Sequence, residues 1–330
     1  MVPRMARALS WCLAACAFTA PALAQAPQEP LRIVVGYSAG GSADQWARIL
    51  APRLSAEAGR PVIVENHPGA GGNVAADLVS RSGARSSLLY MTGASQHGAG
   101  AALNTGARWD PERDFTPIAA VAESVNVVVV RAASPYDSLQ SLLAAGMRGD
   151  RPLTYASPGA GTSPHLAGEL LGHRTGARLV HVPYRGASNA LTDLMGGHVD
   201  LMVVTLTVVR EPLLAGKLRA LAVLSPQRSP ALAAVPTARE AGVPGVEMRV
   251  WAGLVGPPGM PASKADELNH WVGKALDDPA TAQRLQALGS QPFKLDRTAF
   301  RAFVHEELAA GRKLVKDAGM ATQAPGASAP

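Results

Sequence analysis

The feature that most constrains this chain is a strand, a glycine-rich turn and a helix in immediate succession at 31–50, LRIVVGYSAGGSADQWARIL. Its first residues form a short, nearly continuous apolar run, which predicts a buried strand of a parallel sheet. Small residues then interrupt the run, and apolar residues return at helical spacing. We expect Ser42 to be the N-cap of this helix and Asp44 to lie in its first turn, where a carboxylate interacts favourably with the helix dipole.

The glycine-rich turn is also a candidate binding site. In an open parallel sheet it lies at the carboxyl end of its strand, where ligands bind. The N–H groups of Gly40, Gly41 and the helix N-terminus would then point at the ligand, and the helix dipole would favour an anion. The pattern predicts a small-anion site, and the alternative is a turn with a purely structural role.

The same succession occurs again at 153–171, with the turn SPGAGTS at 157–163. Strands and helices alternate along most of the chain, which predicts an α/β fold with a parallel sheet and helices on both of its faces. Two long apolar runs, near 120–131 and 246–256, would cross between two lobes that hold a ligand in the cleft between them. The expected bounds are 27–124 plus 254–320 for a discontinuous first lobe, 125–253 for the second lobe and 321–330 for a disordered tail.

Residues 1–26 have the pattern of a signal peptide. Two arginines precede an apolar stretch, and Ala22-Leu23-Ala24 fits the rule for cleavage after small residues. The predicted location is therefore the periplasm. A competing interpretation is a lipoprotein, because Leu13-Ala14-Ala15-Cys16 resembles a bacterial lipobox. Both cysteines, Cys12 and Cys16, lie in this segment, so the mature chain would have no disulfide and no thiolate metal site.

Composition and motifs argue against several classes of function. The net charge is +6 and aromatic residues make up 5%, with no interleaved basic and aromatic surface for nucleic acid. The sequence has neither a phosphate-binding G-x-x-x-x-G-K-[ST] loop nor the G-x-G-x-x-G pattern of a dinucleotide site. It has no H-E-x-x-H and no paired-cysteine spacing, so we expect neither a metal nor a cofactor.

One motif favours an enzyme instead. Gly36-Tyr37-Ser38-Ala39-Gly40 matches G-x-S-x-G between a predicted strand and a predicted helix, as in the nucleophile elbow of a serine hydrolase. Ser38 would be the nucleophile and would need a histidine within hydrogen-bond reach. None of the 8 histidines has a flanking motif that marks it. A secreted serine hydrolase is the alternative to a binding protein.

Seven segments in order resemble one known family, the Bug/TctC-type solute-binding receptors of tripartite tricarboxylate transporters. They are RIVVGYSAGGSAD, RPVIVENHPGAGGNVAAD, RDFTPIAAVAE, LTYASPGAGTSPHLAGELL, VHVPYRGASNALTDLMGGHVDLM, AGKLRALAVLSPQRSPALAAVPTAREAGVPG and WAGLVGPPGMP. The resemblance implies a two-lobe periplasmic-binding-protein fold, type II-like, that closes on its ligand like a Venus flytrap. It implies a small organic acid as ligand, membrane transporter subunits as partners and no catalysis, and we expect a monomer.

The family holds a ligand carboxylate between one turn from each lobe, so the resemblance assigns ligand-binding residues by position. They are Tyr37, Ser38, Ala39, Gly40, Gly41 and Asp44 in the first lobe, and Ser157, Gly159, Gly161, Thr162, Ser163 and His165 in the second. The residues that would also line the cleft are Gly93, Ala94, Ser95, Tyr184, Arg185, Gly186, Val204 and Thr205, and Trp251 would lie near the return crossing. Both turns are those that the strand–turn–helix pattern selects.

Two departures from the family pattern bear on the ligand. The first turn usually reads P-F-x-P-G-G, and here it lacks the prolines. Many members carry F-D-N after VDLM, with an aspartate that faces the ligand, whereas these positions are Val203, Val204 and Thr205 here. Because Val204 cannot anchor an ammonium group, we expect a plain carboxylate with an apolar or aromatic tail. Transport and sensing use the same closed state, so a ligand sensor with a membrane signalling partner is a further alternative.

Overall fold

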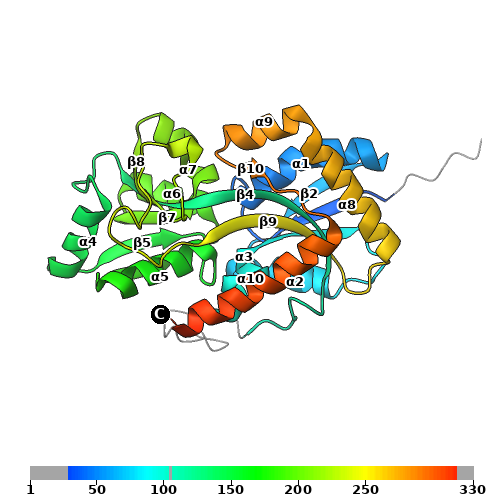
Figure 1. Ribbon diagram of the computed structural model, residues 1–330, viewed down its shortest axis with the longest axis horizontal. Helices are drawn as coiled ribbons and strands as arrows, with labels where there is room; N and C mark the ends of the chain where they lie inside the picture. Colours follow the sequence, from blue (N-terminus) through cyan, green and yellow to red (C-terminus); the bar gives the residue numbers. More distant parts are fainter. Residues whose placement is uncertain (1–28, 104–105, 318–330) are drawn as a thin grey trace, which may run out of the picture.

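The structure, a computed structural model, describes residues 29–103 and 106–317; the predicted signal peptide, Cys16 and the tail at 321–330 lie outside the described residues. The strands are β1 (Leu31–Val35), β2 (Val62–Asn66), β3 (Leu88–Gly93), β4 (Thr116–Arg131), β5 (Leu153–Ser157), β6 (Leu179–Pro183), β7 (Leu201–Thr205), β8 (Leu218–Val223), β9 (Arg249–Gly256) and β10 (Gln291–Pro292). One sheet runs through both lobes in the order β2-β1-β3-β9-β4-β7-β5-β6, and β8 and β10 pair with β4 beside this path (Figure 1).

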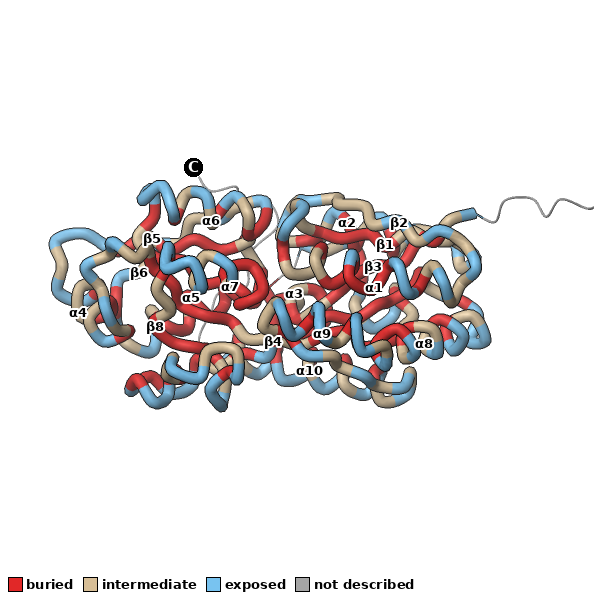
Figure 2. The backbone as a smooth tube through the Cα atoms, turned by 90° about the horizontal axis from the view of Figure 1, so that it is seen from above, coloured by how far each residue is buried: buried red, intermediate tan, exposed pale blue. Residues whose placement is uncertain are grey.

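The helices cover both faces of this sheet. They are α1 (Ser42–Ala58), α2 (Asn73–Ser80), α3 (Ala94–His97), α4 (Leu139–Arg148), α5 (Ser163–Thr175), α6 (Ala187–Gly196), α7 (Leu206–Leu214), α8 (Ala262–Asp277), α9 (Pro279–Ala287) and α10 (Arg297–Asp317), with the short 3₁₀ turns η1 (Ala70–Gly72), η2 (Ala99–Leu103) and η3 (Pro230–Leu232). Buried strands lie between partly exposed helices in both lobes (Figure 2).

Alternating side chains along the strands explain the two helical layers. In the first lobe, Ile33 and Val35 of β1 pack with α1 and α8, while Val34 packs on the opposite face with α2 and α10. In the second lobe, Val128 of β4 faces the core under α4 and α5, while Val127 faces the core under α6 and α7. Successive side chains of a strand point to opposite faces, so apolar runs without polar interruption require cover on both sides, as the sequence predicts.

Two strands cross between the lobes, which confirms the two expected crossover segments. The first half of β4, Thr116–Val125, pairs with β9, and its second half, from Asn126 to Arg131, pairs with β7 and β8. The prediction of a parallel sheet is wrong in part, because β9 runs antiparallel to β3 and β4. A chain that leaves one lobe and later returns to it must run in opposite directions at the two crossings. Residues 249–252, expected in the second lobe, pair with the first-lobe half of β4.

The helix α10 joins the lobes a third time. Phe300, Val304 and Leu308 pack in a first-lobe core cluster, whereas Leu314 and Val315 contact the core of the second lobe. This helix runs along the crossing strands and ends near α5 (Figure 1). Among residues 29–103 and 106–317, two strands and one helix therefore link the lobes.

Candidate functional site

A cavity lies between the two lobes, at the carboxyl ends of their parallel strands. Its free volume is about 70 Å³, within about 640 Å³ of space that includes the open solvent at its mouth. The first residues of α1 and α5 line it from opposite lobes, and residues at the starts of α6 and α7 join them. Unpaired N–H groups at a helix N-terminus attract anions. The arrangement therefore favours a negatively charged group held between the lobes.

In the first lobe, the Asp44 side chain holds the glycine-rich turn in place. Its carboxylate accepts hydrogen bonds from Gly40 N (2.9 Å), Arg48 Nε (2.9 Å) and Asn66 Nδ2 (2.9 Å). Burial acts to raise the pKa of Asp44, but these hydrogen bonds outweigh it, and the pKa lies below its ordinary value. Asp44 is 2% exposed and its carboxylate is used within the turn. It is therefore a positioning residue, and it is absent from the cavity lining.

The expectation that the N–H groups of Gly40 and Gly41 are free is wrong. Gly40 donates to Asp44, and Gly41 donates to Ser38 O at 3.4 Å. Gly41 is also the N-cap of α1, in place of Ser42, because its backbone is already extended at this position. The backbone N–H groups available to a ligand belong to the next two residues, Ser42 and Ala43, and both residues line the cavity.

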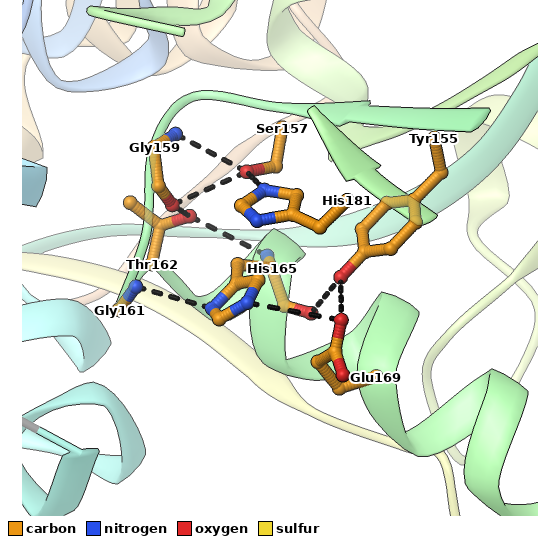
Figure 3. A network of polar contacts seen from close by, with 8 residues as sticks. All are labelled: Tyr155, Ser157, Gly159, Gly161, Thr162, His165, Glu169 and His181. Atoms are coloured by element: carbon orange, nitrogen blue, oxygen red, sulfur yellow. Dashed lines mark hydrogen bonds and ion pairs between the residues drawn. The ribbon is translucent and has the colours of Figure 1, made fainter. Parts of the chain in front are cut away.

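The second-lobe turn uses a different side chain for the same purpose. Gly161 N donates to His165 Nδ1 at 3.1 Å, four residues further on, as Gly40 does to Asp44. Thr162 Oγ1 donates to Gly159 O at 2.7 Å, and Ser157 Oγ contacts both Gly159 and His181 (Figure 3). The turn is held in place by its own polar network. His165, Ser157, Gly159 and Gly161 therefore shape the site without lining the cavity.

Burial disfavours the charged form of both histidines under this turn. Burial lowers the pKa of His165, against the opposing effect of Glu169, and lowers the pKa of His181 to about 3, with a further contribution from His165. Their ring centroids lie 4.1 Å apart, so a charge on one would disfavour a charge on the other. Neutral His165 accepts the Gly161 N–H through Nδ1, and its other nitrogen lies 3.8 Å from Glu169. Neither ring supplies a positive charge to the site.

The structure brings about half of the predicted ligand residues to the cavity wall. Those that line the cavity are Tyr37, Gly41, Ala94, Ser95, Thr162, Ser163, Val204 and Thr205, together with Gly93 and Trp251. Tyr37 also borders a second, neighbouring cavity, which Gly159, Tyr184 and Arg185 line as well. Burial raises the pKa of the Tyr37 hydroxyl, which donates to Gly71 O at 2.9 Å.

Sequence reasoning missed much of the apolar wall. The residues it did not select are Ser42, Ala43, Trp46, Met91, Thr92, Gln96, Pro158, Pro164, Ala187, Val208, Val250 and Ala252. Several lie one helical turn beyond a glycine-rich turn, such as Trp46, or one turn beyond β7, such as Val208. Val208 lies four residues after Val204, a selected position, and this helical spacing is the signal that could have found it; Trp46 has no such spacing from a selected position.

Ser38, Ala39 and Gly186 form contacts between the lobes. Ser188 Oγ donates to Ala39 O at 2.9 Å, and Gly186 lies directly against Ser38, so a side chain at Gly186 would collide with it. Gly71 of the first lobe meets Ala160 O of the second in the same way. These contacts hold the lobes in a closed arrangement.

The nucleophile elbow receives no support from the geometry. Within the part of the chain that the structure describes, the buried Ser38 Oγ has no hydrogen-bond partner. A serine nucleophile needs an adjacent base, and no described residue offers one within hydrogen-bond reach of Ser38 Oγ. Among the described residues, no group of three or more His, Cys, Asp or Glu side chains is placed to hold a metal. No helix in the described ranges is both long and apolar enough to cross a membrane.

The fold and the cavity define the class of two-lobe periplasmic solute-binding proteins. The chain belongs to the tripartite tricarboxylate transporter receptor family, because the family described as "Tripartite tricarboxylate transporter family receptor" matches residues 46–320. The periplasmic binding protein BugD has a TM-score of 0.86 and 30% identity, covering 90% of this chain and 100% of BugD.

Two structures of similar proteins contain a ligand. MatC from Rhodopseudomonas palustris with bound malate has a TM-score of 0.84 and 30% identity, covering 88% of this chain and all (100%) of MatC. An R. palustris protein with adipate has a TM-score of 0.84 and 31% identity, covering 89% of this chain and 98% of that protein.

Proposed function

We propose that the mature protein captures a small organic carboxylate in the inter-lobe cavity and delivers it to a tripartite tricarboxylate-type membrane transporter. The protein would act as a monomer in the periplasm after removal of residues 1–26. The observation that carries this proposal is the meeting of the α1 and α5 N-termini at one uncharged cavity. Helix N-termini hold anions through backbone N–H groups.

The available donors fit a carboxylate. Ser42 and Ala43 offer backbone N–H groups from the first lobe, and the Ser163 hydroxyl accepts from Asn126 Nδ2 at 3.5 Å, which leaves its proton for a ligand. A carboxylate accepts about four hydrogen bonds and gains most from charge-assisted ones. Malate and adipate in the two similar proteins are carboxylates as well. A ligand held by both lobes would favour the closed arrangement.

The first test is binding of organic acids to residues 27–330, measured by thermal shift and calorimetry. A ligand at 100 times its dissociation constant adds about 2.7 kcal/mol to the free energy of unfolding. We expect several small carboxylates to raise the melting temperature and matched amides or alcohols to have no effect. A panel of acids without any shift would contradict the proposal.

Gly41→Asp tests the site itself. A Cβ atom at position 41 would have Ser38 O, at 3.4 Å, as its nearest neighbour, so the side chain has room. Aspartate is also a favoured N-cap residue, so this variant should fold at least as well as the wild type. Its carboxylate would occupy the amides that we assign to the ligand, and affinity should fall at least tenfold. The control is Gly83→Asp, which adds the same charge where no atom lies within 4 Å of the new Cβ. Equal binding by the two variants would refute this site.

A further inference from the structure

We infer that the cavity prefers a monocarboxylate with a compact apolar body over the corresponding dicarboxylate. This inference rests on the proposed function and names the ligand class of the same site. It departs from the two similar proteins, whose bound acids each carry two carboxylates. The first reason is charge: among the described residues that line the cavity, none is an Asp, Glu, Lys, Arg or His.

The second reason is the small number of free donors. Tyr37 donates its hydroxyl proton to Gly71 O at 2.9 Å, and Gln96 Nε2 donates to the same oxygen at 2.5 Å. Thr205 Oγ1 lies 3.4 Å from Asn126 Oδ1, to which it donates. Proline has no N–H group, so Pro164 in the first turn of α5 contributes no amide. The donors that remain include the N–H groups of Ser42 and Ala43 and the hydroxyls of Ser42 and Ser163, as many as the roughly four hydrogen bonds that one carboxylate accepts.

The rest of the wall is apolar and comes from both lobes. Trp46, Met91 and Val250 line it from the first lobe, and Val204 and Val208 line it from the second. Val204 is fully buried and Val208 is 9% exposed. A second carboxylate placed against these side chains would lose its hydration without gaining a cation, which disfavours its binding. A methyl, alkyl or aromatic group would instead gain by burial.

A longer dicarboxylate has one competing route. Arg185 lines the neighbouring cavity, which shares Tyr37 and Pro158 with the main one. An acid that passed between these two residues could place its second carboxylate near the Arg185 guanidinium. Binding of this kind would depend on Arg185, whereas the binding that we infer would not.

Calorimetry with matched acids decides between these arrangements. The pairs are pentanoate with glutarate, hexanoate with adipate, and benzoate with terephthalate, each titrated into residues 27–330 and into Arg185→Gln. We expect the monocarboxylate to bind at least tenfold more tightly than its dicarboxylate in at least one pair, and Arg185→Gln to leave this ratio unchanged. Tighter binding of dicarboxylates in every pair would overturn the inference but keep the proposed function. Binding of no acid at all would overturn both.

Val204→Thr tests the apolar wall at one position with little change in shape. The added hydroxyl should weaken the best monocarboxylate about tenfold and reduce its advantage over the dicarboxylate. Val203→Thr is the matched control, because Val203 lies on the same strand, is equally buried and faces the opposite core, away from the cavity. Val203→Thr also buries a hydroxyl, so it carries the same cost in stability. Its ratio of monocarboxylate affinity to dicarboxylate affinity should stay at the wild-type value. Equal changes of the ratio in both variants would overturn the role of Val204.

Discussion

Removal of the Asp44 carboxylate tests whether the first-lobe turn is shaped before the ligand arrives. In Asp44→Ala, Gly40 N–H loses its acceptor. The Asn66 amide loses one of its two acceptors and keeps Tyr37 O at 3.0 Å, and Arg48 keeps Asn66 Oδ1 at 3.0 Å as a partner. A buried donor left without an acceptor costs about 1–3 kcal/mol, but Gly40 is exposed and Asn66 is half-buried, so water offsets part of this cost. Arg48 is half exposed at 50% and regains water, so its share is small. We expect the free energy of unfolding to fall by about 2 kcal/mol at pH 7, as measured by urea denaturation.

The pH dependence of this loss has a definite sign. The pKa of Asp44 lies below its ordinary value of 3.8 in the folded chain. A carboxyl with a depressed pKa contributes stability that is fully present above its ordinary pKa and is lost as the pH falls through the folded value. The gap in stability between the wild type and Asp44→Ala should therefore be constant near neutrality and shrink below about pH 4.

The control for Asp44→Ala is Asp77→Ala. Asp77 forms an ion pair with Arg81 at 2.8 Å on the surface of α2, where both side chains are exposed. Such pairs contribute about 0–1 kcal/mol, so this variant should stay close to the wild type. Affinity for the ligand should fall in Asp44→Ala and stay unchanged in Asp77→Ala. An Asp44→Ala variant within 1 kcal/mol of the wild type at pH 7 would refute the role assigned to this carboxylate.

Two further predictions concern closure of the lobes. Gly186→Ala places a methyl group against Ser38 in the closed arrangement and should lower ligand affinity at least tenfold, as measured by calorimetry. The control is Gly176→Ala, which also has a positive φ but has no atom within 4 Å of the new methyl group, and it should affect only stability. Equal ligand affinities of the two variants would contradict the contact between Gly186 and Ser38. Ser290 Oγ lies 2.9 Å from Thr207 Oγ1 of the second lobe and also accepts from Trp46 Nε1 of the cavity wall at 2.9 Å, so it connects this wall to the second lobe. Ser290→Ala should lower the free energy of unfolding by about 2 kcal/mol and weaken ligand binding, and unchanged urea denaturation and calorimetry would count against this link.

Strand and helix positions could be predicted from the sequence because the apolar runs and glycine-rich turns are local signals. The antiparallel β9 could not be predicted in the same way, since its direction follows from the return of the chain between lobes. The N-cap of α1 was assigned to Ser42 from the preference of serine for this position. Gly41 occupies it instead, because its backbone is extended at φ −71° and ψ 165°.

The candidate site shows the same division between local and distant determinants. The two turns could be located from their residues alone, and Ser163 and Val204 are in the cavity wall. The direction of the Asp44 carboxylate could not be predicted, because Asn66, which donates to it, comes from the end of β2. Trp46 and Val250 belong to segments that only the folded chain brings together, so no pattern within either segment indicates a shared wall.

The matched turns, Gly40 held by Asp44 and Gly161 held by His165, make each lobe a self-contained half of the site. The ligand does not have to order either half; it has to bridge them. Binding can then be treated as a bivalent problem, in which a ligand held weakly by one lobe meets the other at an effective concentration set by β4, β9 and α10. Tighter connections between the lobes would raise that concentration and the affinity without any new contact to the ligand.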